Sequence, residues 1–202
     1  MKDTYKTIAK KAPEVLFKDK GSKFFGYAFP VSTEDDIKLY LEEIKTSHNS
    51  ARHHCYAWQL GTGDGQVQYR ANDDGEPSNT AGMPIYGQIQ SFNVTNVLIV
   101  VVRYFGGVKL GVGGLINAYK TTAQMCLEAS SIIEKTIDNR YLIAFQYKDM
   151  NNVMRVIKEK NLQIESQKMD LSCKITVSIR KSEAKQAMKA FEPFYEVNIT
   201  EV

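Results

Sequence analysis

Three stretches of this sequence contain most of the side chains that could carry out chemistry. The stretch 51–57 has two adjacent histidines and a cysteine, and 73–82 has three carboxylates and two hydroxyls. The stretch 103–115 has five glycines set among basic and aromatic residues. Imidazole, carboxylate and guanidinium groups are common agents of acid–base chemistry and phosphate binding in proteins.

The first stretch reads as a β-strand, in which successive side chains face opposite ways. His53 and Cys55 therefore share one face, and Arg52 and His54 share the other. His53 and Cys55 could form a thiolate–imidazole pair or half of a zinc site. Zinc needs three or four ligands, however, and His48 is the remaining histidine. We favour a core cysteine beside a hydrogen-bonded histidine, with Arg52 and His54 as phosphate or partner contacts, and expect no metal and no cofactor.

The second stretch combines carboxylates with turn-forming residues. Its three acids could hold a hard cation or supply a general base. Asp-Gly and Glu-Pro pairs are equally typical of turns, and the hydroxyls typical of helix caps. The run of unusual residues favours function, although acids beside a helix N-terminus conflict with its preference for anions. The candidate polar site comprises His53, Asp73, Asp74, Glu76, Ser78 and Thr80.

The third stretch follows an apolar run and precedes a helical pattern that begins near Gly113. Its glycines free backbone N–H groups, which together with basic and aromatic side chains could cradle an anion or stack on a base. It is neither a Walker A motif nor a dinucleotide fingerprint, because no Gly-Lys-Ser/Thr ends the run and Ile116 stands where a glycine is needed. A tight turn packed under the helix remains an equal alternative. The candidate phosphate or nucleic-acid contacts are Arg52, His54, Arg103, Tyr104, Gly106, Gly107, Lys109, Gly111, Gly113 and Gly114.

Hydrophobic periodicity predicts the elements that position these stretches. Ser32 and Asp35 have the spacing of a capping box at the start of a helix, and Ser78 or Thr80 is expected to cap a later one. Residues 95–104 are expected to form a strand whose apolar residues are continuous rather than alternating, which indicates burial on both faces. The expected order is a polar lead-in at 18–23, a strand at 24–29, a helix at 32–48, strands at 51–60 and 66–71 around a turn at 61–65, a helix to 89, the strand 95–104 and a helix to 129.

The pattern restarts after Ser130 and predicts a second domain. Asp149 and Ser182 are expected to cap its two helices, which alternate with four strands in the order βαββαβ. This is the ferredoxin-like arrangement. We therefore expect an α+β protein with domains at 1–136 and 137–202. The expected elements are strands at 141–147, 162–169, 173–180 and 195–202, and helices that follow Asp149 and Ser182.

Composition places the chain among ordinary globular proteins, with 43% hydrophobic and 24% charged residues. A net charge of +3 is mild, so nucleic-acid binding would have to use a local patch. Three widely spaced cysteines argue against a disulfide framework and for a reducing compartment. Met1–Lys11 has no apolar core of a secretory signal, and no apolar run approaches the ~20 residues of a membrane span. We expect a cytoplasmic location and no membrane contact.

The three stretches together resemble the IMPACT family, in its bacterial YigZ-type branch. The resemblance rests on 51–57, 73–82 and 103–115, with Ala118-Tyr119 behind them. It extends from about Lys18 to Ser130, and the βαββαβ part fits the second domain of the bacterial members. Asn79 stands where many members have glycine, but asparagine tolerates the left-handed conformation better than most residues.

The resemblance implies a first domain like domain 2 of ribosomal protein S5 and a second like the C-terminal part of elongation factor G. Eukaryotic members regulate translation through a further domain that these residues do not match, so that role does not transfer. For bacterial members it implies a nucleic-acid-binding or translation-associated role, with no agreed catalytic residues. Our hypothesis is a non-enzymatic module that binds RNA or a ribosome or translation factor through one face shared by Arg52, His54, Arg103, Tyr104 and Lys109. The alternative is an enzyme acting on a phosphorylated or acyl small molecule; the sequence leaves the oligomeric state open.

Overall fold

The computed structural model describes residues 3–62, 67–170 and 172–202, so part of the predicted turn at 61–65 lies outside the described residues. Contacts divide the chain into two compact units. One is Tyr5–Lys135, and the other is Thr136–Val202 together with Asp3 and Thr4. Each unit has its own hydrophobic core.

The N-terminal unit is organised around a five-stranded sheet in the order β2-β3-β6-β4-β5, with every neighbouring pair antiparallel. The central strand β6 has every residue from Val97 to Val102 fully buried, which confirms the prediction of a strand covered on both faces. A separate two-stranded sheet pairs β1 with β7. The strand bounds are β1 Thr4–Ile8, β2 Val15–Asp19, β3 Ser22–Pro30, β4 His53–Leu60, β5 Gln68–Asn72, β6 Val97–Tyr104 and β7 Ile132–Thr136.

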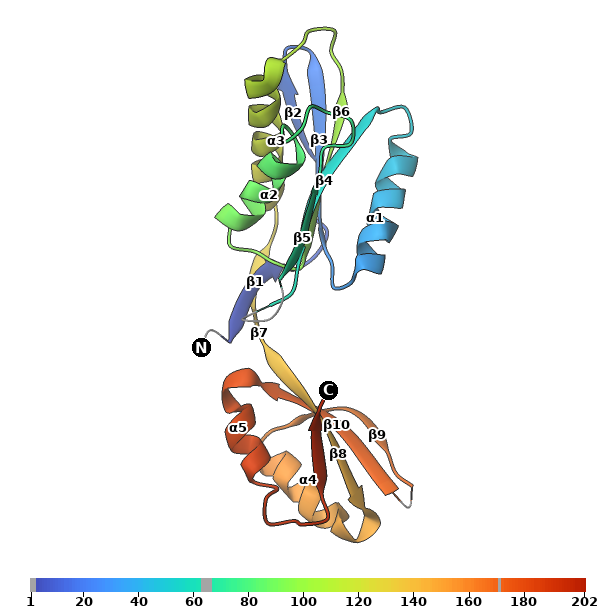
Figure 1. Cartoon of the computed structure of the whole chain (residues 1–202), viewed down its shortest axis with the longest axis vertical. Coiled ribbons are helices and arrows are strands. Elements are labelled where there is room, and N and C mark those ends of the chain that lie inside the picture. Colours follow the sequence, from blue (N-terminus) through green and yellow to red (C-terminus); the bar gives the residue numbers. More distant parts are fainter. Residues whose placement is uncertain (1–2, 63–66, 171) are drawn as a thin grey trace. The chain divides into compact units, whose positions relative to one another are not determined.

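Helices cover both faces of this sheet (Figure 1), which makes the unit a three-layered α/β sandwich. Helix α1 (Glu34–Ser47) lies on one face; α2 (Gly82–Ser91) and α3 (Gly111–Glu128) lie on the other. The alternation along β6 follows these layers. Ile99 and Val101 belong to the core under α2 and α3, whereas Val100 and Val102 belong to the core under α1.

The helix caps of this unit differ from those predicted. The capping box of α1 is formed by Thr33 and Asp36, one residue later than the predicted Ser32 and Asp35. The prediction that Ser78 or Thr80 caps α2 is wrong, because Ala81 occupies the N-cap position and makes no side-chain hydrogen bond. A carboxylate from an earlier turn takes that role instead.

The segment predicted as a polar lead-in is a hairpin turn. Lys20 and Gly21 join β2 to β3 and both have positive φ, 44° and 81°. Two consecutive positive φ angles are typical of the type I′ hairpin turn. Strand β2 was not predicted because its apolar run is short, and the paired strands β1 and β7 were not predicted either.

The C-terminal unit has a four-stranded sheet in the order β11-β8-β10-β9. In chain order this is 4-1-3-2, which confirms the ferredoxin-like arrangement. Cys173, Ile175 and Val177 on β10 are fully buried, as their alternation predicts. The elements are β8 Asp138–Gln146, a 3-10 turn at Tyr147–Asp149, α4 Met150–Glu159, β9 Gln163–Lys168, β10 Ser172–Arg180, α5 Lys181–Lys189 and β11 Asn198–Glu201.

Asp149 and Ser182 do not act as the predicted caps. Asp149 occupies the N-cap position of α4, but its side chain makes no capping hydrogen bond. Helix α5 begins directly after β10 with Arg180 at the N-cap. The Ser182 side chain is instead hydrogen-bonded to Asp3. The Arg180 guanidinium, followed by the Ser182 hydroxyl, lowers the pKa of Asp3 to about 2. Among the described residues, no helix is long and apolar enough to cross a bilayer.

Candidate functional site

The three stretches singled out in the sequence meet at the end of β6 in the N-terminal unit. His53 Nδ1 lies 2.8 Å from the Asp74 carbonyl, and the His54 amide donates to the Asp74 carboxylate over 2.6 Å. Arg103 donates to Glu76 over 2.7 Å. The acidic turn therefore connects the strand with the histidines to the strand that leads into the glycines.

The sheet separates two sets of residues that we predicted to share one face. His53 pairs with Arg103 and His54 with Val102 in the β4–β6 register. Because side chains alternate, Arg103 and His53 face α2 and α3, while His54 and Tyr104 face α1. The prediction of a single face holding Arg52, His54, Arg103, Tyr104 and Lys109 is wrong in that respect. Arg103 and His53 from one face and Tyr104 from the other border the same hollow at the end of β6.

Arg103 is an interior cation, not a surface one. Its side chain is 7% exposed and pairs with Glu76, whose side chain is 4% exposed. Its guanidinium carbon lies 5.6 Å from the ring centroids of both Phe24 and Phe105. The ion pair and the two aromatic rings compensate for the desolvation of the charge.

Glu76 also connects the ion pair to helix α3. Tyr119, which is fully buried, donates its hydroxyl proton to the same oxygen of Glu76 over 2.7 Å. The Cys55 sulfur lies 3.3 Å from the Tyr119 hydroxyl and 2.9 Å from the Asp73 carbonyl. Cys55 is fully buried, which agrees with its interpretation as a core cysteine, and its sulfur contacts Tyr119 and Asp73 rather than a histidine. Burial raises the pKa of its thiol well above its usual range.

Asp73 accounts for the conflict between an acidic turn and a helix N-terminus. One of its oxygens accepts from the amides of Ala81 and Gly82, and the other from the amide of Asn79. The carboxylate thus caps α2 from outside the helix, where the macrodipole favours negative charge. Asn79 has a φ of +61°, the left-handed conformation expected of the residue that replaces glycine.

Asp74 and Thr80 among the other candidate polar residues also have structural roles. Asp74 and Gly75 have φ angles of +41° and +84°, and the Glu76 amide donates to the Asp73 carbonyl, which makes a type I′ turn. Thr80 is buried and donates its hydroxyl to the Pro77 carbonyl, whereas Ser78 is exposed. Among the described residues, no group of three or more His, Cys, Asp or Glu side chains is placed to hold a metal.

The two histidines of β4 differ in their burial and in the hydrogen bonds of their ring nitrogens. His54 is buried, and its Nε2 lies 3.2 Å from the His48 carbonyl, so this ring fixes the chain after α1. His53 is half-buried and has its Nδ1 against the Asp74 carbonyl, so Nδ1 carries the proton and Nε2 is left as a base. His53 borders a hollow of about 410 Å³ together with Arg52 and Tyr104.

The glycines after β6 serve different purposes. A Cβ atom on Gly106 would lie 1.9 Å from the carbonyl carbon of Gly21, so the loop packs directly on the β2–β3 turn. Gly107 and Gly111 have φ angles of +90° and +74°. A Cβ on Gly114 would meet Leu110 at 3.0 Å, and one on Gly113 would meet nothing within 4 Å. Packing thus explains part of the glycine content, and Gly113 stands in open space.

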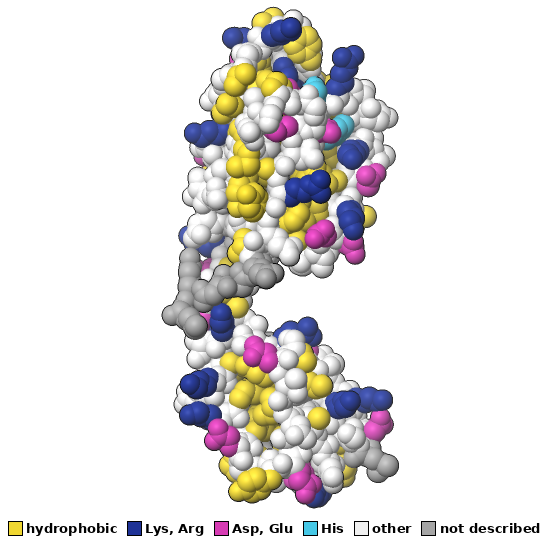
Figure 2. Space-filling view, viewed as in Figure 1, with side chains coloured by type: hydrophobic (Ala, Val, Ile, Leu, Met, Phe, Trp, Pro, Cys, Tyr) yellow, Lys and Arg dark blue, Asp and Glu magenta, His cyan; other side chains and the backbone are white. Residues whose placement is uncertain are grey.

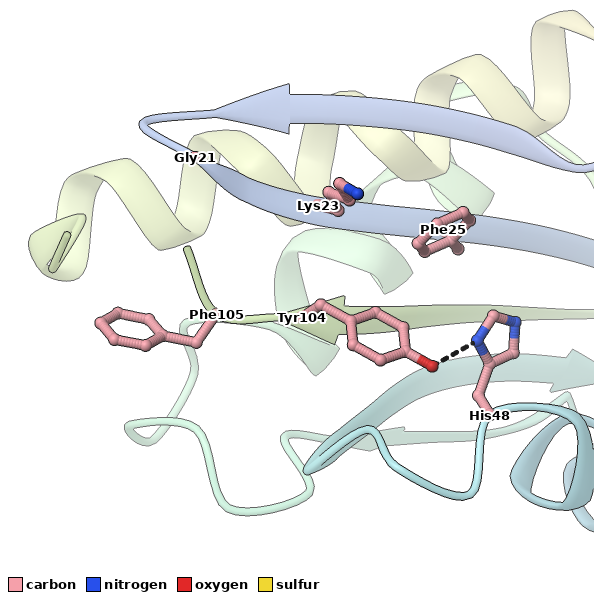
Figure 3. A pocket seen from close by; sticks show the side chains of 6 residues that line it. All are labelled: Gly21, Lys23, Phe25, His48, Tyr104 and Phe105. Atoms are coloured by element: carbon pink, nitrogen blue, oxygen red, sulfur yellow. Dashed lines mark hydrogen bonds between the residues drawn. The ribbon is translucent and has the colours of Figure 1, made fainter. Parts of the chain in front are cut away.

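Phe105 lies between three hollows that surround the end of β6. The first is the hollow beside His53. The second measures about 440 Å³ and is lined by Lys23, Phe25, His48 and Tyr104. The third measures about 420 Å³ and lies at the start of α3. Figure 3 shows the second, with the aromatic side chains of β3 and β6 and the hydrogen bond from Tyr104 to His48. In Figure 2, basic and apolar side chains gather at this end of the unit.

Residues from β3 and from the loop after α1 line the site but were not predicted to belong to it. Lys23 and Phe25 reach the site through the pairing of β3 with β6, in which Phe25 lies opposite Val102, whereas His48 reaches it from the end of α1 and is hydrogen-bonded to Tyr104. Phe105 lies in the stretch 103–115 but was not among the predicted nucleic-acid contacts. In the structure its side chain is 58% exposed, which is unusual for an aromatic residue. The adjacent glycines were the one available signal.

His48 is held as a neutral imidazole by two tyrosines. Its Nε2 lies 2.6 Å from the Tyr27 hydroxyl, which donates to Glu14, and its Nδ1 lies 3.0 Å from the Tyr104 hydroxyl. Nε2 therefore carries the proton and Nδ1 accepts from Tyr104. Burial lowers the pKa of His48, Glu14 opposes that change, and His54 adds to it.

This arrangement predicts that stability decreases as the pH falls below about 6.5. With a folded pKa below the ordinary value of 6.5, His48 takes up a proton more readily in the unfolded chain, so its contribution is complete above that pH and is lost below it. Urea unfolding at pH 7.5 and 5.5 should show a smaller decrease for His48→Gln than for the wild type. His53→Gln is the matched control, and an equal decrease in all three proteins would contradict the assignment.

Fold and site define a two-domain α+β protein whose N-terminal sandwich presents a loop-and-turn site at the end of its central strand. Residues 20–127 match the family model of the Impact N-terminal domain, and the chain belongs to the IMPACT family. It is 34% identical over 134 residues to the IMPACT family member YigZ of Escherichia coli, with 66% of each chain covered. Over 137 residues it is 36% identical to YvyE of Bacillus subtilis, covering 68% of this chain and 62% of that relative.

The matches span just under two thirds of the length of YigZ and YvyE. Among solved structures, the crystal structure of a hypothetical protein has a TM-score of 0.78 at 25% identity, covering 100% of this chain and 98% of the other. That similarity extends over both units. The two-domain fold predicted from the sequence is therefore shared with a solved structure.

Proposed function

We propose that this protein is a cytoplasmic, translation-associated module that binds single-stranded RNA at the end of β6. The translation role rests on the resemblance of its three stretches to the IMPACT family. The observation that carries RNA binding is Phe105, an exposed aromatic side chain with a hollow on each side and lysines nearby.

The chemistry around Phe105 suits a nucleic-acid strand. Phe105 and the half-buried Tyr104 offer ring faces on which bases can stack, each stacked base contributing ~1–3 kcal/mol. Lys23, Arg52 and Lys109 are exposed around the same hollows and can contact phosphates. Arg103 has a different role from the one first expected, because it is buried against Glu76 and holds the platform in place.

Substitution of the exposed residues tests this proposal. Lys23→Ala combined with Lys109→Ala should weaken binding to a mixed-sequence single-stranded oligoribonucleotide about tenfold and reduce the slope of log K against log salt by ~0.7 per lysine. Phe105→Ala should cost ~1–3 kcal/mol of binding with little change in that slope. Fluorescence anisotropy at several salt concentrations measures both effects.

A double substitution away from the hollows provides the matched control. Lys38 on α1 and Lys135 on β7 are exposed and border none of the three hollows, and their removal changes the net charge equally. Lys38→Ala with Lys135→Ala should leave binding unchanged at physiological salt. Equal weakening by both pairs, or no RNA binding by the wild type, would overturn the proposal. Ribosome co-sedimentation without RNA binding would assign the surface to a protein partner instead.

A second candidate function rests on the free Nε2 of His53. This nitrogen borders a hollow with Arg52 and could act as a base toward a phosphorylated or acyl small molecule. The carboxylates lend less support, because Asp73 caps α2 and Glu76 is bound in the interior. A metabolite screen by thermal shift tests this reading: stabilisation of the wild type but not of His53→Ala, with no effect of RNA, would favour the enzyme.

A further inference from the structure

The hollow on the α3 side of Phe105 is bordered by a buried donor that has no partner among the described residues, Arg103 Nε, and by a helix N-terminus without a side-chain cap. It measures about 420 Å³ and is bordered by Arg103, Lys109 and the first residues of α3, Gly111 and Val112. These groups are all hydrogen-bond donors or cations. Glu76 borders the hollow as well and is its one acidic residue.

Arg103 is the first of these groups. Its Nη1 donates to Glu76, but its Nε is buried and has no hydrogen-bond partner among the described residues. A buried donor without an acceptor costs ~1–3 kcal/mol relative to a satisfied one. A native protein retains such a group chiefly where a ligand, ion or water completes it.

The N-terminus of α3 is the second. Its N-cap residue is Leu110, which makes no side-chain capping bond, and its first turn has no acidic residue. The N-termini of the other two helices on this sheet are capped by side chains. Thr33 and Asp36 cap α1, and the Asp73 carboxylate caps α2. An uncapped helix N-terminus presents free amides and a partial positive charge to an anion.

The balance of charge in the hollow also favours an anion. The single negative group, Glu76, is paired with Arg103 and accepts from Tyr119. Lys109 is exposed at the rim and adds a positive charge with no acidic neighbour bordering the hollow besides Glu76. The ligand that would complete these donors is therefore a small oxyanion with several acceptor oxygens.

We infer that this hollow is a phosphate-binding subsite, which takes a phosphoryl group of the bound RNA strand between Arg103 Nε, the first amides of α3 and Lys109. The inference rests on the proposed function for the identity of the strand, but the subsite is defined by its own donors. A phosphate held here would place the adjoining nucleotide beside the exposed ring of Phe105.

Titration with inorganic phosphate, followed by ¹⁵N NMR, tests the subsite directly. Saturable shifts are expected at the amides of Gly111 and Val112 and at the Arg103 Nε–H resonance, with none on adding sodium chloride to equal ionic strength. Lys109→Ala should weaken phosphate binding about tenfold. Lys120→Ala, an exposed residue later on α3, should leave it unchanged. Absence of shifts at these three groups, or shifts spread evenly over all lysine-rich surfaces as for an adventitious ion only, would overturn the inference.

Adding the oligoribonucleotide in place of phosphate separates this inference from the proposed function. Shifts at the same three groups support both. RNA binding that leaves these resonances in place overturns the subsite but not RNA binding. Phosphate binding without any RNA binding overturns the proposed function and the strand as the source of phosphate, while the anion site itself stands.

Discussion

Replacing Glu76 with alanine should lower the free energy of unfolding by about 3–5 kcal/mol, which is the usual cost of removing one partner of a buried ion pair. The Arg103 guanidinium would remain in the interior at 7% exposure without its counter-charge. Tyr119 would also lose the acceptor of its hydroxyl proton, since no other acceptor than Glu76 is in place among its described contacts. Urea unfolding monitored by circular dichroism at pH 7 measures the effect.

Two further variants make this result specific. Glu76→Gln keeps the size of the side chain and one acceptor oxygen, so it should be destabilising but less so than alanine. Glu43→Ala removes an exposed partner of Lys11, with side chains 46% and 49% exposed, and should cost less than about 1 kcal/mol. If Glu76→Ala were no more destabilising than Glu43→Ala, the buried pair would not hold the site together.

The sequence predicts the layered core well because burial leaves a direct signature. The continuous apolar run of 97–102 has to lie in the middle of a sheet with both faces covered, and β6 does. The clean alternation of Cys173, Ile175 and Val177 likewise predicts one covered face, and all three are buried. Where side-chain polarity and period agree, local pattern and tertiary packing give the same answer.

The site was less predictable because its contacts join residues distant in the chain. A carboxylate in a turn can cap, pair or catalyse, and residue type does not distinguish these roles. Asp73 caps a helix that starts at Gly82, and Glu76 binds Arg103 and Tyr119. Only the strand register shows that Arg103 faces the interior while its neighbour Tyr104 faces the other side of the sheet.

The glycine-rich loop shows the same limit, because glycine content alone does not separate close packing from ligand binding. Gly106 is required by packing: its amide donates to the Ser22 hydroxyl over 3.2 Å, and its α-carbon lies against the backbone of the β2–β3 turn. Gly113 has neither a positive φ nor a close neighbour. The two positions should therefore respond oppositely to the same substitution.

Gly106→Ala should destabilise the protein by roughly 3 kcal/mol, at the upper end of what overpacking costs. The added Cβ would lie 1.9 Å from the Gly21 carbonyl carbon and 2.2 Å from the Ser22 nitrogen, and backbone atoms cannot rotate away as a side chain does. The loop would have to lift from the hairpin, which would displace Phe105 and weaken RNA binding as well. Thermal and urea unfolding measure the first effect and fluorescence anisotropy the second.

Gly113→Ala is the matched control, with the same added methyl group in the same segment. No heavy atom lies within 4 Å of its new Cβ, and alanine favours a helix over glycine by up to about 1 kcal/mol, so the variant should be as stable as the wild type or more so. Equal destabilisation by both substitutions would mean that the loop tolerates no side chain anywhere, and the close approach of Gly106 to Gly21 would not be the cause. Opposite signs would show that packing explains Gly106 and leaves Gly113, in the first turn of α3, to be explained by what binds there.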